Sequence, residues 1–174
     1  MNSVLIAGIG NTFHGDDGFG VAVAQQLAQS EAPAGVDVID FGIRGLDLAY
    51  ALTSGYRLAV LVDTVQRGGQ PGTLYLIEPE LADMDAQSCA LSPHQIDPAS
   101  ILQLTRVLGG ECARIFFIGC EPASFGDEEE GHVGLSEPVA GAIAEAAAMS
   151  TALIVEWLAA HPLLESREQK ELMQ

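Results

Sequence analysis

Continuously apolar segments alternate with helix-forming segments along most of this chain of 174 residues. The apolar runs have the length of strands, and apolar residues recur at helical spacing between them. The runs do not alternate between apolar and polar residues, which is typical of strands whose two faces are both covered by helices. The expected strands span residues 3–10, 36–42, 57–65, 72–78 and 113–122, and the expected helices span 18–30, 46–54, 97–109 and about 136–161.

The order of these segments predicts a three-layer α/β sandwich, with a five-stranded, mostly parallel twisted sheet and helices on both faces. Residues 66–72 form too short a connection for a parallel crossover, which needs about a dozen residues, so the strand at 72–78 is expected to be antiparallel. No repeat or linker divides the sequence, and its length is typical of one domain. We therefore predict a single domain over 1–174, with the polar segment 163–174 frayed.

Acidic residues dominate the charge of the chain, whose 24 acidic and 7 basic residues give a formal net charge of −17. Phosphate contacts need Lys and Arg, so binding to nucleic acid or to an anionic membrane surface is disfavoured. Glu145 and Glu156 interrupt the apolar segment 138–160, which favours a packed helix over a membrane span. Three cysteines without C-x-x-C spacing, and an N-terminus without a basic region, indicate a reduced cytoplasmic protein.

A glycine-rich segment, G-I-G-N-T-F at 8–13, follows a strand and precedes a helix, which is the position of a dinucleotide-binding loop. Phe13 stands where the third glycine of that fingerprint belongs. Asp16 and Asp17 place negative charge where a pyrophosphate needs N–H groups. We therefore expect no nucleotide cofactor. Either aspartate suits an N-cap of the helix that starts at Gly18, and we expect Asp17 to be the one left free.

Asp63 follows an apolar run, at a position where a parallel sheet has its carboxyl edge and where α/β proteins bind ligands. Asp17, in the loop after the first strand, and His94, in the turn S-P-H-Q, are expected at the same edge. Two carboxylates and an imidazole suit a borderline divalent metal such as zinc or nickel. A cap or turn role for Asp63, and for Asp40 at the end of the second strand, stays an alternative, as does a plain turn role for His94.

An ordered set of segments resembles the hydrogenase maturation endopeptidases. The segments are GIGNTFHGDDGFG (8–20), DFG (40–42), LVDTV (61–65), PGTLYLIEP (71–79) and SPHQ (92–95). The resemblance runs from about Val4 to the final helix. It implies an endopeptidase that removes a C-terminal extension from the large-subunit precursor of a nickel–iron hydrogenase after nickel insertion. It also implies that Asp17, Asp63 and His94 form the metal-contacting, catalytic set.

Two positions depart from the pattern of this family. Asp17 stands where some members have Glu, so a shorter side chain approaches the metal. The family's D-G-G stretch after the second strand is here D-F-G, followed by I-R-G. The resemblance implies that this segment touches the substrate, so we expect Asp40, Gly42 and Arg44 to do so. Arg44 meets either a carboxylate of the precursor tail or a partner on the protein's own surface.

The nickel is expected to arrive with the precursor. A metal polarises a peptide carbonyl or lowers the pKa of an attacking water, and a carboxylate acting as general base is the other route. Two further functions stay open at this point. One is a non-catalytic, nickel-dependent checkpoint chaperone of the same precursor, and the other is a metallohydrolase of small peptides.

Overall fold

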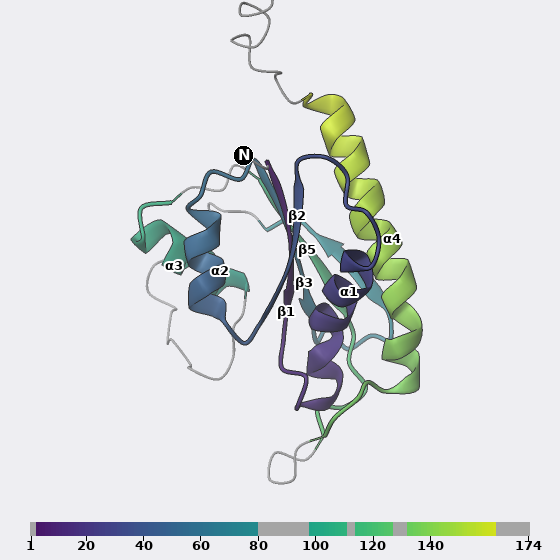
Figure 1. Cartoon of the computed structure of the whole chain (residues 1–174). Helices are drawn as coiled ribbons and strands as arrows, with labels where there is room; N and C mark the ends of the chain where they lie inside the picture. The colour runs from purple at the N-terminus through teal and green to yellow at the C-terminus, as the bar shows by residue number, and fades with distance from the viewer. Residues whose placement is uncertain (1–2, 80–97, 111–113, 127–131, 163–174) are drawn as a thin grey trace, which may run out of the picture.

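Five strands and four α-helices follow one another in the predicted order, in a computed structural model that describes residues 3–79, 98–110, 114–126 and 132–162 (Figure 1). The strands are β1 (Val4–Ile9), β2 (Val36–Gly42), β3 (Leu58–Thr64), β4 (Leu74–Ile77) and β5 (Ile115–Cys120). The α-helices are α1 (Phe19–Ala28), α2 (Gly45–Leu52), α3 (Pro98–Val107) and α4 (Glu137–Ala160), and a 3-10 helix, η1 (Gly15–Gly18), precedes α1. The tail predicted to fray, 163–174, lies outside the described residues.

The strands form one sheet in the order β2-β1-β3-β5-β4. β1 pairs in parallel with β2 and β3, and β3 pairs in parallel with β5. β4 pairs antiparallel with β5, because the connection from β3 is too short for a crossover. The predicted three-layer fold with one antiparallel strand is confirmed. The carboxyl ends of the parallel strands meet at one edge of the sheet, the lower edge in Figure 1, while β2 and β4 are the outer strands.

Helices cover both faces of the sheet, with α1 and α4 on one side and α2 and α3 on the other (Figure 1). The side chains of β1 alternate between the two resulting cores. Val4 and Ile6 pack with α1 and α4, whereas Leu5, Ala7 and Ile9 pack with α2 and α3. Every residue of β1 is buried, which explains why this strand is continuously apolar in sequence.

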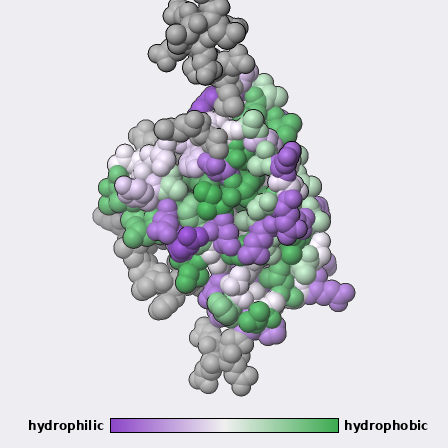
Figure 2. Space-filling model, in the orientation of Figure 1, coloured by the Kyte–Doolittle hydropathy of each residue, from purple (hydrophilic) through white to green (hydrophobic). Residues whose placement is uncertain are grey.

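Helix α4 is the one helix among the described residues that is long and apolar enough to cross a membrane, with a mean hydropathy of 1.6 over its most apolar window. Its inner side is packed into the core, where Val139, Ile154 and Trp157 are buried. Its outer side carries Glu145 and Glu156. The right-hand side of Figure 2, where α4 runs, shows hydrophilic and hydrophobic residues mixed. In this fold α4 is therefore a packed outer layer, as the two glutamates predict.

Two glycines let α1 lie close to the sheet near the carboxyl edge. A Cβ on Gly20 in α1 would lie 2.0 Å from the carbonyl oxygen of Val62 in β3. A Cβ on Gly8 in β1 would lie 2.3 Å from the carbonyl oxygen of Gly20. Neither position has room for a methyl group, so a larger residue would push α1 away from the strands. This close approach holds the connection between β1 and α1 against the edge of the sheet.

We expect Gly20→Ala to lower the free energy of unfolding by about 2–3 kcal/mol, because the neighbouring backbone atoms cannot move aside as a flexible side chain can. The matched control is Gly141→Ala on the exposed side of α4, where a Cβ meets nothing within 4 Å. Helix propensity predicts a gain of about 0.5–1 kcal/mol for that control. Urea unfolding measures the free energy of unfolding of both variants. Equal values for Gly20→Ala and Gly141→Ala would contradict a close contact between α1 and the sheet at Gly20.

Candidate functional site

The chain turns at Gly10, directly after β1, and this turn brings two aspartates together. Gly10 adopts a φ of 127°, which L side chains rarely adopt. A Cβ there would lie 1.8 Å from the carbonyl oxygen of Asp17 and 3.5 Å from Oδ1 of Asp63. The N–H of Gly10 donates to the carbonyl oxygen of Gly42, 3.1 Å away. The ends of β1, β2 and β3 therefore meet around one glycine.

Asp17 is the outer member of this pair. It lies in η1, is half-buried, and accepts a hydrogen bond at Oδ2 from the N–H of Asn11, 2.9 Å away. A carboxylate has about four acceptor positions, so most of the capacity of Asp17 is left for other partners. As predicted, Asp17 is the less engaged of the two consecutive aspartates.

Asp63 is the inner member, in the buried part of β3, and it is 8% exposed. The N–H of Thr64 donates to its Oδ1 over 2.7 Å. Burial raises the pKa of Asp63 to about 8, against the lowering effect of that hydrogen bond, and the charge of Asp17 raises it further. At neutral pH this carboxyl group therefore keeps its proton. A cation at this edge would displace the proton, because nearby positive charge favours the ionised form.

The hydroxyl of Thr64 lies between the two carboxyl groups. Its Oγ1 is 3.5 Å from Oδ1 of Asp17 and 3.5 Å from Oδ1 of Asp63, at the outer limit of a hydrogen bond. The one hydroxyl proton serves one acceptor at a time. The pair thus combines a protonated inner carboxyl with a partly exposed outer carboxylate, which suits proton transfer or the binding of a divalent cation.

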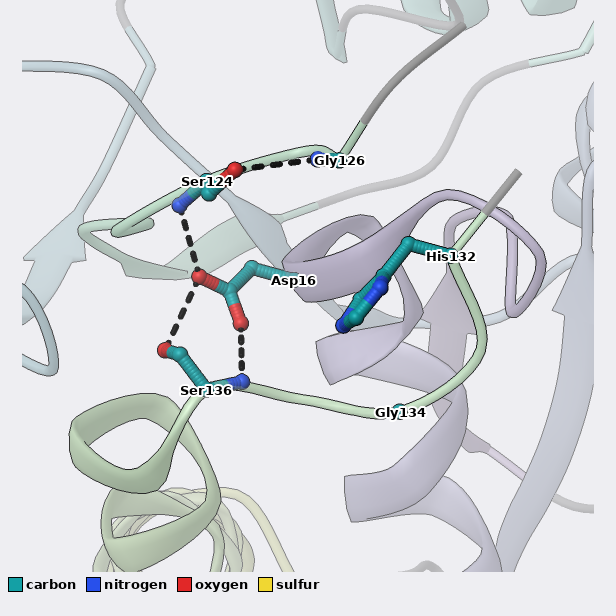
Figure 3. Close-up of a pocket in the computed structure, with 6 residues that line it drawn as sticks. All are labelled: Asp16, Ser124, Gly126, His132, Gly134 and Ser136. Carbon is teal, nitrogen blue, oxygen red and sulfur yellow. Dashed lines mark hydrogen bonds between the residues drawn. The ribbon is translucent and has the colours of Figure 1, made fainter. Parts of the chain in front are cut away.

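Asp16 has a different role from its neighbour, and only 1% of it is exposed. Its Oδ2 accepts hydrogen bonds from the N–H groups of Ala123 (2.7 Å) and Ser124 (3.0 Å) and from the hydroxyl of Ser136 (3.0 Å), as Figure 3 shows in part. Its Oδ1 accepts from the N–H of Ser136 at 2.6 Å. Burial by itself would raise the pKa of Asp16, but the hydrogen bonds from Ser136, Ser124 and Ala123 outweigh burial and lower it. Asp16 therefore joins the loop after β1 to the segment after β5 and to the N-cap of α4.

The expectation that Asp16 or Asp17 caps the following helix is wrong. Neither η1 nor α1 has a side-chain hydrogen bond at its N-cap position. The donors that Asp16 satisfies lie 107 to 120 residues further along the chain. Asp16 therefore stabilises a junction between distant segments, for which local sequence spacing carries no signal.

The segments that Asp16 joins enclose a small hollow (Figure 3). Its volume is about 120 Å³, and it is lined by Asp16, Ser124, Gly126, His132, Gly134 and Ser136. Two backbone hydrogen bonds lie beside this hollow. The N–H of His132 donates to the carbonyl oxygen of Phe13 over 3.0 Å, and the N–H of Gly15 donates to the carbonyl oxygen of His132 over 2.7 Å. Because the carboxylate of Asp16 is already bonded to its four donors, it is not a vacant ligand in this hollow.

Two of the residues predicted to touch substrate lie at the end of β2. Gly42 has a φ of 53°, and its carbonyl oxygen faces the Gly10 turn. Oδ2 of Asp40 accepts a hydrogen bond from Nε2 of Gln25 in α1, 3.2 Å away. Asp40 and Gly42 therefore border the two-aspartate site, and their contact with substrate stays a prediction.

Arg44, the third residue of that predicted set, folds back on its own loop. Its guanidinium donates to the carbonyl oxygens of Phe41 and Asp40. It also lies 3.8 Å from a carboxylate oxygen of Asp47. These contacts match the alternative of a partner on the protein's own surface, and a role in substrate binding stays a prediction.

Known proteins with similar sequences and structures identify the family. A sequence model of hydrogenase maturation proteases matches residues 21–153, most of the chain. The chain belongs to the hydrogenase maturation protease family. Hydrogenase expression/formation protein HupD of Bradyrhizobium diazoefficiens is 30% identical over 157 residues, which cover 90% of this chain and 80% of that protein. The hydrogenase maturating endopeptidase HybD of Escherichia coli is a solved structure with a TM-score of 0.72 at 26% identity, over 90% of this chain and 93% of that chain.

The structure describes two of the three residues that were predicted to contact the metal in this maturation protease. Asp17 and Asp63 lie near each other, with Oγ1 of Thr64 3.5 Å from an oxygen of each, and their contact with a metal stays a prediction. His94 belongs to 80–97, outside the described residues. Within the described residues, no group of three or more His, Cys, Asp or Glu side chains is arranged to hold a metal ion. Two carboxylates fill only part of the coordination of a divalent cation, so a cation bound here needs further ligands.

Glu121, a further buried acid of the maturation protease, was not predicted from the sequence. It directly follows β5, is 5% exposed, and accepts hydrogen bonds from the N–H groups of Arg67 and Gly68 and from the hydroxyl of Tyr75. Burial would raise the pKa of Glu121, but these hydrogen bonds outweigh burial and lower it. A signal was present in the sequence, because Glu121 ends a buried apolar run at the carboxyl edge, as Asp63 does.

Replacing the buried acid of the pair should stabilise the maturation protease, and more strongly at higher pH. Between the ordinary aspartate pKa of 3.8 and the raised value of about 8, the folded state holds a proton that the unfolded state has lost. Stability therefore falls as pH rises through this window. Asp63→Asn keeps the acceptor for the N–H of Thr64 without the charge, so we expect a gain on the order of 2 kcal/mol at pH 8 that shrinks towards pH 5.

Urea unfolding at the two pH values measures this gain. The control is Asp47→Asn, which makes the same change to a side chain that is 61% exposed. A gain from Asp63→Asn as large at pH 5 as at pH 8 would contradict a protonated, buried Asp63.

Removing Asp16 should destabilise the loop junction. Asp16→Ala leaves three N–H groups and one hydroxyl without their acceptor, and we expect a loss on the order of 3–4 kcal/mol. Ser136→Ala removes only the hydroxyl and should cost about 1 kcal/mol. Because the pKa of Asp16 is lowered, its stabilisation is present above the ordinary value of 3.8 and is lost as pH falls through the lowered folded value. Equal losses from the two variants at pH 7, measured by urea unfolding, would show that the carboxylate does not hold the junction.

Proposed function

We propose that this maturation protease removes the C-terminal extension of a nickel–iron hydrogenase large-subunit precursor after nickel has been inserted. In this proposal Asp17, Asp63 and His94 engage the nickel that the precursor carries. The observation that carries the proposal is the meeting of Asp17 and Asp63 around Gly10, at the carboxyl edge of the sheet, in a chain of the hydrogenase maturation protease family. The reaction is proposed to take place in the cytoplasm.

The electrostatics of the pair suit a metal that arrives with the substrate. Without a cation, Asp63 is buried beside a second carboxylate, and protonation relieves that repulsion. Nickel at the edge of the sheet would make ionised Asp63 the favoured form and would bring both carboxylates into use as ligands. The protease then responds to a loaded precursor, because the productive charge state of its site depends on the metal.

Peptide hydrolysis requires an activated water and a polarised carbonyl group. Nickel at the precursor supplies one route, in which the metal polarises the scissile carbonyl or lowers the pKa of the water. In the other route, one of the two carboxylates takes the proton from water as general base. In both routes the hydroxyl of Thr64, 3.5 Å from an oxygen of each aspartate, orients the carboxyl groups.

A cysteine nucleophile has no support among the described residues. Cys120 is free and buried at the end of β5. Burial raises the pKa of its thiol to about 11, and the charge of Asp16 contributes to this rise. A nucleophilic cysteine needs a lowered pKa and access to substrate, and Cys120 has neither.

Mass spectrometry of a nickel-loaded large-subunit precursor, incubated with the protease, tests the proposal. We expect the wild-type protein to release a C-terminal peptide only when nickel is loaded. Asp63→Asn and His94→Ala should slow release by about 100-fold or more, because each removes a group that engages the metal or the proton. Glu145→Gln on the exposed side of α4 is the matched control and should cleave at the wild-type rate.

The other outcomes separate the alternatives. Binding of the loaded precursor without cleavage would favour a checkpoint chaperone. Turnover of short peptides without any precursor would favour a metallohydrolase of small peptides. Equal cleavage by wild type and Asp63→Asn would place the reaction elsewhere on the protein.

A further inference from the structure

Positive charge is scarce in this chain and unevenly placed. Two of its 7 basic residues belong to 163–174, and the structure describes the other five. Arg57 and Arg114 directly precede β3 and β5, at the amino edge of the sheet, and Arg106 lies in the last turn of α3. Among the described residues, Arg44 and Arg67 are thus the two cations in connections at the carboxyl edge, beside the two-aspartate site.

The guanidinium groups of these two arginines are engaged differently. Arg44 is bonded to the carbonyl oxygens of its own loop and lies near Asp47. Arg67 is exposed, and its guanidinium lies over the ring of Tyr75, 5.5 Å from the centroid. No hydrogen bond or ion pair joins that guanidinium to another of the described residues. Stacking on an aromatic ring steadies a guanidinium and leaves its N–H groups available to a ligand.

The loop that carries Arg67 is tightly constrained. The buried carboxylate of Glu121 accepts the N–H groups of Arg67 and Gly68, and burying a carboxylate is costly unless such donors are present. Gly68 has a φ of 77°. A Cβ on Gly69 would lie 2.1 Å from the hydroxyl oxygen of Tyr75, so a side chain at this position would displace that hydroxyl from its place beside the loop. The fold therefore presents the side chain of Arg67 to solvent from a fixed backbone, shortly after the end of β3.

We propose that Arg67 binds a carboxylate of the peptide tail that this protease cuts, an inference that rests on the proposed function. The edge where the tail would lie carries the carboxyl groups of Asp17 and Asp40, in a chain with a net charge of −17. An acidic tail is repelled from such a surface unless a cation meets it. A C-terminal extension always ends in a carboxylate, and acidic side chains add others.

The position of Arg67 also sets a direction for the bound tail. Its loop leads from the end of β3 to Glu121 after β5 and to Tyr75 in β4. A tail held by Arg67 therefore runs from the two-aspartate site towards the β5–β4 side of the sheet. The planar guanidinium forms two parallel hydrogen bonds with a carboxylate, which a lysine at the same position cannot reproduce.

Cleavage kinetics of the nickel-loaded precursor by Arg67 variants test this inference. Arg67→Ala should raise KM about three- to tenfold and leave kcat within about twofold, because it removes binding and not chemistry. Arg67→Lys should have a smaller effect and Arg67→Glu a larger one. The rise in KM should shrink at high salt, because this contact is exposed. Arg106→Ala, which removes the same charge from α3, is the matched control and should leave KM unchanged.

Two altered precursors identify the carboxylate. In one, the acidic side chains of the extension are replaced by amides, and in the other, neutral residues added after the natural C-terminus displace the terminal carboxylate. The alteration that removes the partner of Arg67 should raise KM for wild type and cause no further rise for Arg67→Ala. An unchanged KM for Arg67→Ala on the natural precursor would overturn the inference and leave the proposed function standing. Absence of cleavage by wild type would overturn both.

Discussion

The carboxylate of Asp16 holds three segments of the carboxyl edge in a fixed relation to one another. Asp16 lies in η1 and accepts hydrogen bonds from the segment after β5 and from the N-cap of α4, so it ties these segments to one another. Asp17 is carried on the same short helix, and its position therefore follows from that of Asp16. The turn at Gly10 then determines how closely Asp17 approaches Asp63. The geometry of the site thus depends on a residue that takes no part in the proposed chemistry.

Two aspartates of this edge show how hydrogen-bond donors decide the state of a buried carboxyl group. Asp16 and Asp63 are similarly inaccessible, at 1% and 8% exposed. Three backbone N–H groups and a hydroxyl surround Asp16, and they keep its pKa low in spite of burial. Asp63 has one short hydrogen bond and a negatively charged neighbour, and its pKa is raised. The first arrangement builds a structural junction, whereas the second leaves a group that changes its charge when a cation arrives.

Most of the fold could be predicted from the sequence, because the central strands β1, β3 and β5 are buried on both faces and each connection has a length that restricts its direction. The short connection before β4 was enough to predict an antiparallel strand. The proximity of Asp17 and Asp63 was predictable too, since Asp17 lies in the connection after β1 and Asp63 lies near the carboxyl end of β3, the parallel neighbour of β1. The role of Asp16 was not predictable, because its partners are more than a hundred residues away and belong to loops without periodicity. His94 lies outside the described residues, so its part in the site stays a prediction.

The position of β2 at the outside of the sheet has a consequence for how copies of this protein behave at high concentration. An outer strand presents a row of N–H and C=O groups, which is a template for pairing with a strand of another molecule. β2 carries Asp37 and Asp40 along its length, in a chain with a net charge of −17. When two such edges approach, carboxylates meet carboxylates, and the repulsion opposes the growth of a continuous intermolecular sheet. The acidity that surrounds the site therefore also protects the protein from aggregation through the strand that borders it.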